Sequence, residues 1–437
     1  MSDTNLGPQD RTGKPYMNEQ LLIEDQNNLR RLARLKEQGV GFPCGATSVY
    51  VGSEVDPARI SEGVVLYPGT RITGSRTLIN AHAVIGLRGP CVVNDMVIGA
   101  GAVLGSGFFE QSVLLDGVKL GASVRVRENC LFEEACEMSF SADVKHTFLL
   151  ANVVLGSEIN FCDIFMSGGT SRKDHSEVGS GVIHFNFTPF GESGDKATAS
   201  LIGDAVHGVF YRSKRIFVGG HASLIGPLRI GYGSVIAAGA RADSDIGEEI
   251  LTFGSTRTPK DIKGFDFLCY KNIKRKLGTC IEYVAQLAAL WHWYGTARAG
   301  VVETELGQET IRAALDLIAS GIDVRIDRID RLHSYMDESI ARNQALNEDA
   351  LVNQQKTFKK QWPAFREKLA GFMDVEGDIA ERDRLMEAIS VQSANYKNDF
   401  VALVSQGLDE DAVSHGTAWL QSIVDELTEG ATGLSPI

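Results

Sequence analysis

The stretch that decides the fold is residues 57–105, which read PARISEGVVLYPGTRITGSRTLINAHAVIGLRGPCVVNDMVIGAGAVLG. Aliphatic residues recur in it at every sixth position, at Ile60, Leu66, Ile72 and Leu78. A period of six fits neither an α-helix nor an ordinary strand. It is typical of a triangular prism in which each six-residue rung supplies one strand and one corner, with the aliphatic side chain pointing inward.

The same period continues far along the chain. It recurs at Leu114, Leu120 and Val126, and again at Val218, Leu224, Ile230 and Ile236. Glycine follows many of these aliphatics, and 46 glycines against 11 prolines suit an architecture with many tight turns. Three rungs, about 18 residues, close one coil. Residues 46–256 therefore predict a left-handed parallel β-helix of at most about ten coils. It is interrupted by loops at residues 165–197 and 205–216.

The segments on either side have different patterns. Residues 1–45 predict a disordered start, up to residue 16, and an amphipathic helix over residues 17–37. Residues 267–430 lose the six-residue period and predict an α-helical domain. We expect its helices near residues 269–302, 308–318, 322–345, 354–370, 376–405 and 409–428, with Gly321 as one of the breaks between them. The fold class is thus a mainly β solenoid with a C-terminal α-helical domain.

Composition excludes several classes of function. A formal net charge of -13 argues against nonspecific electrostatic binding of nucleic acid. The sequence contains no run of 18 apolar residues, so we expect no segment that crosses a membrane. Residues 1–16 are polar and contain no secretory signal. The seven cysteines are an odd number without a C-x-x-C pair, which indicates reduced thiols in a cytoplasmic protein and no metal site.

Beyond the hexapeptide repeats, three stretches carry a more specific signal. They are Lys145-His146 with Leu155-Gly156, then Gly181–Phe187 with Lys196 and Leu201–Asp204, and finally Phe217–Gly220 with Leu224–Pro227 and Ala237–Gly239. With these stretches, residues 54–245 resemble the acetyltransferase half of the bifunctional enzyme that makes UDP-N-acetylglucosamine. The nucleotidyltransferase half of that family has no counterpart in the sequence, so we expect that domain to be absent.

The resemblance implies a site and its ligands. His146 falls on the family's general base, a role that suits an imidazole, which takes a proton near neutral pH. Arg127, Asn186 and Lys196 fall on positions that contact the amino sugar and its phosphate. Gly220 and Ala238 fall on the groove for acetyl-coenzyme A. The family also implies a homotrimer with grooves between neighbouring prisms. Hydrophobic rung faces cannot all be covered by one chain, which favours the same assembly.

The residues themselves add one candidate and several departures from the family. His207, Arg212, Lys214 and Arg215 form the densest basic cluster of the predicted prism. Arg212 and Lys214 are therefore candidates for binding the coenzyme or a phosphate, and a solvated loop is the alternative. Leu149 and Phe187 stand where the family has tyrosines, and Glu177 stands where it has an asparagine. A buried polar substrate needs its hydrogen bonds met, so these changes put the acceptor's identity in question.

Three hypotheses follow from the sequence. The first is a hexapeptide-class acyltransferase that uses acetyl-coenzyme A and acts on an amino-sugar phosphate or a nucleotide sugar. The second is a non-catalytic trimeric scaffold or sugar-nucleotide-binding protein that kept the β-helix. The third is a zinc carbonic anhydrase, which needs three histidines at a subunit interface; five are available, but no pair has the close spacing of that class.

Overall fold

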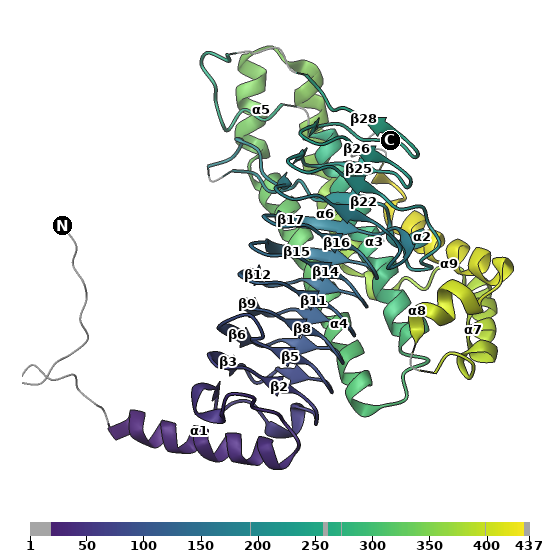
Figure 1. Cartoon of the computed structure of the whole chain (residues 1–437). Helices are drawn as coiled ribbons and strands as arrows, with labels where there is room; N and C mark the ends of the chain where they lie inside the picture. The colour runs from purple at the N-terminus through teal and green to yellow at the C-terminus, as the bar shows by residue number, and fades with distance from the viewer. Residues whose placement is uncertain (1–18, 193, 257–260, 272, 398, 432–437) are drawn as a thin grey trace, which may run out of the picture.

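The computed structural model describes residues 19–192, 194–256, 261–271, 273–397 and 399–431. The predicted disordered start, residues 1–16, lies outside the described residues. The chain forms a β-solenoid of about 11 turns over residues 50–252, followed by a helical region (Figure 1). Helix α1 (Glu19–Glu37) lies across the N-terminal end of the solenoid, where the Asn28 side chain bonds the backbone of Val49 and Val51.

The solenoid is a prism with three faces of parallel strands. Face A consists of β2 (Val65–Leu66), β5 (Val84–Ile85), β8 (Val103–Leu104), β11 (Lys119–Leu120), β14 (Glu137–Met138), β16 (Val154–Leu155), β20 (Glu177–Val178), β23 (Phe217–Val218), β26 (Val235–Ile236) and β28 (Leu251–Thr252).

Face B consists of β1 (Tyr50–Val51), β3 (Thr70–Thr73), β6 (Cys91–Asn94), β9 (Gly107–Glu110), β12 (Val124–Val126), the first halves of β15 (Asp143–Leu149) and β17 (Asn160–Met166), β21 (Ile183–Phe185), β24 (Ser223–Ile225) and β27 (Arg241–Ala242). Face C consists of β4 (Leu78–Ile79), β7 (Val97–Ile98), β10 (Val113–Leu114), β13 (Leu131–Phe132), the second halves of β15 and β17, β22 (Ser200–Ile202) and β25 (Arg229–Ile230). Strands β15 and β17 therefore run through the corner between faces B and C.

The prism interior is filled by the periodic aliphatics, as predicted, with one exception. Leu66 and Ile72 are buried in the interior, and so are the equivalent residues of later coils. Leu78 does not belong to this core, because it is Ile79 that takes the inward position in β4. Leu78 instead packs outward, against the helical region.

Three segments leave the repeat at corners of the prism. Residues 167–176 contain the antiparallel pair β18 (Gly169–Ser171) and β19 (Asp174–His175). Residues 186–199 leave the corner between faces B and C, and residues 203–216 contain the short helix α2 (Ala205–Gly208). Short 3-10 turns η1 (Ala46–Ser48) and η2 (Pro57–Arg59) flank the first strand. The three segments that leave the repeat lie within or close to the loops predicted at residues 165–197 and 205–216.

The helical region packs along the prism through α3 (Lys274–Trp293) and α4 (Glu305–Ser334). It contains α3, the π-helical turn η3 (Tyr294–Arg298), α4, α5 (Met336–Ala345), α6 (Asp349–Ala370), the 3-10 turn η4 (Phe372–Asp374), α7 (Ile379–Ser393), α8 (Phe400–Ala402), the π-helical turn η5 (Leu403–Gly407) and α9 (Glu410–Thr428). The break expected at Gly321 is wrong, because α4 runs through it. In the described part of the chain, no helix has both the length and the apolar composition to cross a bilayer.

Helices α3 and α4 cover face C. From β4 to β22 its outward residues are apolar and buried in one core with these helices, namely Leu78, Val97, Val113, Leu131, Phe148, Phe165 and Leu201. In β25 the outward residue is Arg229. The chain's own helices therefore cover one of the three rung faces. Faces A and B carry no such cover among the described helices, and Phe108 on face B is 59% exposed.

Candidate functional site

The corner between faces B and C is built from residues with left-handed backbone. Residues with positive φ stack there on successive coils, namely Asp95, Gln111, Asn129, His146 and Asp163. The angle is 47° at His146 and 62° at Asp163. Asn, Asp and His adopt this region more readily than most residues, which explains their use here. We call these five positions the corner column.

His146 and Asp163 are stacked directly on each other. In the register of β15 and β17, Lys145 pairs with Cys162 and Thr147 pairs with Ile164, so the corner residues between them are also neighbours. Adjacent strands of a sheet lie about 4.8 Å apart. The predicted general base therefore has a carboxylate on the next coil.

The imidazole of His146 is buried and uncharged. The residue is 8% exposed, and among the described residues its buried Nδ1 atom has no hydrogen-bond partner. Burial lowers the pKa of His146 to about 4; the Asp163 carboxylate opposes this change, and Arg325 and Lys145 reinforce it. At neutral pH the ring is thus a free base.

Asp163 is held on both of its oxygens. Its Oδ1 atom accepts a hydrogen bond of 2.5 Å from Nη2 of Arg325 on α4, and Oδ2 accepts one of 2.5 Å from Nδ2 of Asn186. Burial alone would raise the pKa of Asp163, but Arg325 and His146 lower it below its usual value. The corner thus contains a buried carboxylate that stays ionised.

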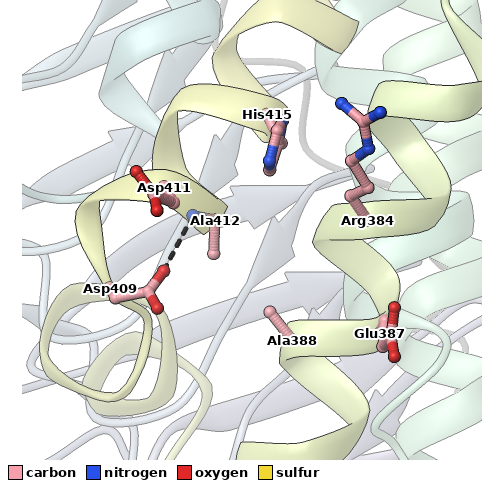
Figure 2. Close-up of a pocket in the computed structure, with 7 residues that line it drawn as sticks. All are labelled: Arg384, Glu387, Ala388, Asp409, Asp411, Ala412 and His415. Atoms are coloured by element: carbon pink, nitrogen blue, oxygen red, sulfur yellow. Dashed lines mark hydrogen bonds between the residues drawn. The ribbon is translucent and has the colours of Figure 1, made fainter.

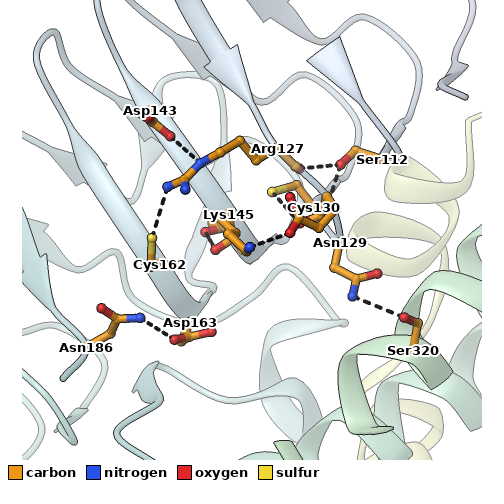
Figure 3. A network of polar contacts seen from close by, with 12 residues as sticks. Ser112, Arg127, Asn129, Cys130, Asp143, Lys145, Cys162, Asp163, Asn186 and Ser320 are labelled. Carbon is orange, nitrogen blue, oxygen red and sulfur yellow. Dashed lines mark hydrogen bonds and ion pairs between the residues drawn. The ribbon is translucent and has the colours of Figure 1, made fainter. Parts of the chain in front are cut away.

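Polar side chains continue from this corner onto face B (Figure 3). Arg127, Lys145 and Cys162 follow one another on successive coils, next to the corner column. Arg127 donates through Nε to Asp143 (2.7 Å) and through Nη2 to the sulfur of Cys162 (3.3 Å), while Lys145 forms an ion pair with Glu128. The predicted sugar-phosphate arginine therefore lies on the same surface as His146, and Figure 3 shows both cationic side chains above Asp163.

The loop of residues 186–199 begins at the corner and contains both other predicted sugar contacts. Asn186 bonds Asp163, and Lys196 is exposed on the same loop. The neighbouring Asp195 forms a buried ion pair with Lys276 at the start of α3. The loop is therefore tied to the prism at one end and to the helical region at the other.

The predicted coenzyme positions lie at a different corner. Gly220 and Ala238 follow the face A strands β23 and β26, at the corner between faces A and B, three and four coils beyond His146. Three strand spacings correspond to about 14 Å along the prism. A Cβ atom on the adjacent Gly219 would lie 2.4 Å from the backbone nitrogen of Ala238. The close stacking of coils at this corner accounts for the small residues there.

The basic cluster of the 203–216 segment is divided by the fold. Arg212 donates to the backbone carbonyl oxygens of Ser405 (3.0 Å) and Val404 (3.3 Å), and pairs with Glu410 (3.0 Å). Lys214 is exposed and pairs with Glu249. Arg212 thus joins α2 to the C-terminal helices, and Lys214 is the one of the two that faces solvent.

The positions that depart from the family are scattered over the prism. Leu149 points into the prism interior opposite Phe132, so it supplies packing. Glu177 lies on face A beside His175, at 3.5 Å. Phe187 is 55% exposed at the start of the loop of residues 186–199, next to Asn186.

The described part of the chain contains no group of three His, Cys, Asp or Glu residues that could hold a metal ion. His146 lies at one corner and His221 at another, while His184 points into the prism interior between Phe161 and Leu224. These three histidines thus lie apart within one chain, and the zinc hypothesis depends on a contact between chains.

A cleft of about 290 Å³ lies apart from the corner column, between helices α7 and α9 (Figure 2). It is lined by Arg384, Glu387, Ala388, Asp409, Asp411, Ala412 and His415, most of which carry charged or polar groups. Asp409 caps the start of α9 by accepting from the Ala412 backbone, and His415 pairs with Glu381 at 2.5 Å. Arg384 also pairs with Glu381, so these groups serve helix contacts and the cleft presents no arrangement suited to acyl transfer.

Sequence reasoning missed Asp163 and Arg325. Asp163 had a signal, because it lies 17 residues after His146, and His146 lies 17 residues after Asn129. That spacing is close to one coil. Arg325 lies on the buried stripe of α4 that contains Ile318, Ile322 and Ile329, and a charge on an apolar stripe is itself unusual.

The comparisons with known proteins concern the prism. The chain is 25% identical over 212 residues to the bifunctional protein GlmU of Streptococcus equi subsp. zooepidemicus, covering 48% of this chain and 40% of the relative. It is 26% identical over 244 residues to GlmU of Acinetobacter baumannii, covering 53% and 45%. The chain spans less than half the length of these relatives.

Among solved structures, LpxA from Acinetobacter baumannii is similar over 48% of this chain and 68% of its own, with 15% identity and a TM-score of 0.20. No protein-family model matches the chain. The six-residue repeats, the β-solenoid and the similarity over about half of the chain agree: this chain is distantly similar to the GlmU relatives and has a hexapeptide-repeat β-solenoid.

Proposed function

We propose that the chain is an acyltransferase that moves an acetyl group from acetyl-coenzyme A to the amine of an amino-sugar phosphate or a nucleotide sugar, with His146 as the general base. The observation that carries the proposal is the corner column, where an uncharged imidazole lies beside a surface with two cationic side chains, Arg127 and Lys145. A neutral imidazole accepts a proton, and cationic side chains suit a sugar phosphate.

The chemistry needs one proton acceptor. The amine nitrogen forms a bond to the thioester carbon, the carbon–sulfur bond breaks, and the sulfur leaves as coenzyme A thiolate. His146 takes the proton that the amine loses, and that proton ends on the thiol. Arg127, Asn186 and Lys196 hold the sugar and its phosphate in this proposal, while Gly220, Ala238 and Lys214 line the coenzyme path. Arg212 acts at most indirectly, since its guanidinium already binds the helices.

A second candidate is the non-catalytic scaffold or sugar-nucleotide-binding protein. One observation favours it: His146 is only 8% exposed and is covered by the chain's own helix α4 through Arg325 and Asp163. A protein that only binds a nucleotide sugar has no need of an accessible base. Binding of the sugar without turnover of acetyl-coenzyme A distinguishes the two functions.

We further propose a cytoplasmic homotrimer. All seven cysteines are free thiols, as a reducing compartment would keep them. Outward apolar side chains lie toward both ends of face A, including Val84, Val103 and Val235, which suits contact with another prism. Because α3 and α4 cover face C, the trimer contacts fall to faces A and B. Analytical ultracentrifugation of the full chain tests the oligomeric state.

The test of catalysis is acetyl transfer to a panel of amino sugars, amino-sugar phosphates and nucleotide sugars, followed by the mass of the product. Mass detection is needed because the chain's own exposed thiol, Cys44, would react with a thiol reagent. His146→Asn, which keeps a residue tolerant of positive φ, is expected to lower kcat/KM by about 100-fold or more while acceptor binding persists.

The matched control is His221→Asn. His221 is an exposed corner residue with φ 56°, at the corner between faces A and B. It should leave turnover unchanged. Equal turnover in the His146→Asn variant and the wild type would rule out His146 as the base, and sugar binding with no acetyl transfer by the wild type would favour the scaffold.

A further inference from the structure

The helical region contributes a charged group to the candidate site. Arg325 lies on the buried stripe of α4, is 2% exposed, and reaches across the corner to Asp163, which is also 2% exposed. The neighbouring helix position, Gly321, contacts Phe148 two residues after His146, so α4 lies closely against this part of β15. The site in this chain is therefore completed by a segment some 160 residues further on.

The arrangement decides what Asp163 can bind. As the stacked neighbour of His146, its carboxylate is the natural partner for the imidazole. Both of its oxygens are taken, one by Arg325 and one by Asn186. In the described part of the chain, the Nδ1 atom of His146 is left with no partner. The donors that hold Asp163 are thus Arg325 and Asn186, and no hydrogen bond joins it to His146.

We infer that Arg325 is a positioning residue, which binds Asp163 and thereby keeps that carboxylate off His146, so that the imidazole stays free to act as a base. This inference rests on the proposed role of His146. Arg325 itself need not contact the acceptor. Its effect is to make a helical region that covers face C also a part of the active site.

The charges around His146 give the direction in which its pKa should change when Arg325 is replaced. Its neighbours are Asp163 on β17, Arg325 on α4, Lys145 on β15 and Glu128 at the preceding coil, with His184 and Arg328 further out beside Asp163. Removing Arg325 deletes a positive charge and frees a carboxylate. Both changes favour protonated imidazole, so the pKa of His146 should rise.

The experiment is NMR titration of the full chain with isotope-labelled histidine, in which the His146 signal is assigned by its loss in His146→Asn. In the wild type the ring should titrate near pH 4. Arg325→Met should raise the pKa of His146 by about 1 or more. Arg331→Ala, at an exposed position of the same helix, should leave it unchanged. A folded Arg325→Met variant with an unshifted His146 would overturn the inference.

Two further variants keep the test decisive if Arg325→Met does not fold. Asp163→Asn/Arg325→Met removes both charges, so no unpaired carboxylate remains buried, and His146 should titrate at a low pH as in the wild type. Arg325→Lys keeps the charge and should restore most of the wild-type titration. If the double variant instead titrates with a raised pKa, Asp163 is not the group that Arg325 restrains.

The readout also separates this inference from the proposed function. NMR titration needs no acceptor and no turnover, so it can succeed even if His146→Asn retains activity and the proposed base is wrong. Where an acceptor is found, Arg325→Met should move the acidic limb of the kcat/KM profile to higher pH. If the acidic limb of the profile does not move in Arg325→Met while His146→Asn is inactive, the acyltransferase function is supported and the role of Arg325 is excluded.

Discussion

Gly321 of α4 lies directly on the aromatic ring of Phe148 on face C. A Cβ atom at position 321 would lie 2.6 Å from Cζ of Phe148, closer than real Cβ contacts come. The glycine thus lets the helix approach the prism, and α4 brings Arg325 to the corner column one turn later. A residue expected to end a helix instead sets the distance between two layers.

Gly321→Ala should destabilise the chain although alanine is the better helix former. In an open helical position this change would gain roughly 1 kcal/mol. Here the added methyl must displace the Phe148 ring or the helix, at a cost of about 1–3 kcal/mol. We expect a lower free energy of unfolding in urea. Phe148→Leu in the same chain should recover part of the loss, and a stabilised Gly321→Ala variant would contradict the contact.

A second prediction concerns the buried charges that join η3 to the prism. Arg298 is 3% exposed and donates to both oxygens of Glu134, at 2.6 and 2.8 Å, and to the hydroxyl of Tyr211 at 2.7 Å. The fully buried Glu133 lies 3.3 Å from the same guanidinium. Arg298→Met should lower the free energy of unfolding by about 3 kcal/mol or more, because both carboxylates lose their counter-ion.

The matched control is Arg382→Met, whose partner Asp383 is exposed and whose loss should cost under about 0.5 kcal/mol. Burial raises the pKa of Glu133, so this group should be protonated early as the pH falls. The difference in stability between Arg298→Met and the wild type should therefore become smaller at acid pH. Thermal unfolding at several pH values tests both statements. A gap that widens toward acid pH would mean that Glu133 is not the group left unpaired.

Much of the fold could be predicted from the sequence, because an inward aliphatic at every sixth position is a local pattern. The same pattern could not decide whether Leu78 or Ile79 faces the prism interior, since both are aliphatic. The outward Leu78 is buried only because α3 and α4 cover it. His146 lies at a corner, and its stacked neighbour Asp163 lies one coil away in the sequence. The contact of Arg325 with Asp163 could not be predicted, since two elements this far apart in the sequence are not linked by any regular spacing.

A third prediction distinguishes the two basic residues of the 203–216 segment. Arg212→Ala removes donors from the carbonyl oxygens of Val404 and Ser405, so hydrogen exchange should accelerate over residues 400–428 while the prism amides stay protected. Lys214→Ala removes only an exposed ion pair with Glu249 and should leave exchange unchanged. Equal exchange in the two variants would show that Arg212 does not hold the C-terminal helices.

The last prediction is the acid sensitivity of the prism. Burial lowers the pKa of both His146 and His184 to about 4, whereas an unfolded histidine titrates near 6.5. The unfolded chain therefore binds protons first as the pH falls. The stability that each neutral ring contributes is complete above about pH 6.5 and declines toward pH 4, by roughly 1.4 kcal/mol per pH unit for each histidine.

His184 offers the sharper test, because its ring is fixed inside the prism. Its Nδ1 atom lies 2.6 Å from the Cys162 carbonyl oxygen and Nε2 lies 2.8 Å from the Ser200 hydroxyl, so the ring donates to the first and accepts from the second. His184→Gln should be less stable at pH 7.5 but lose less stability between pH 6.5 and 4.5, measured by urea unfolding. The exposed His221→Asn should keep the wild-type slope, and a wild-type slope in His184→Gln would mean that the ring is already protonated in the folded chain.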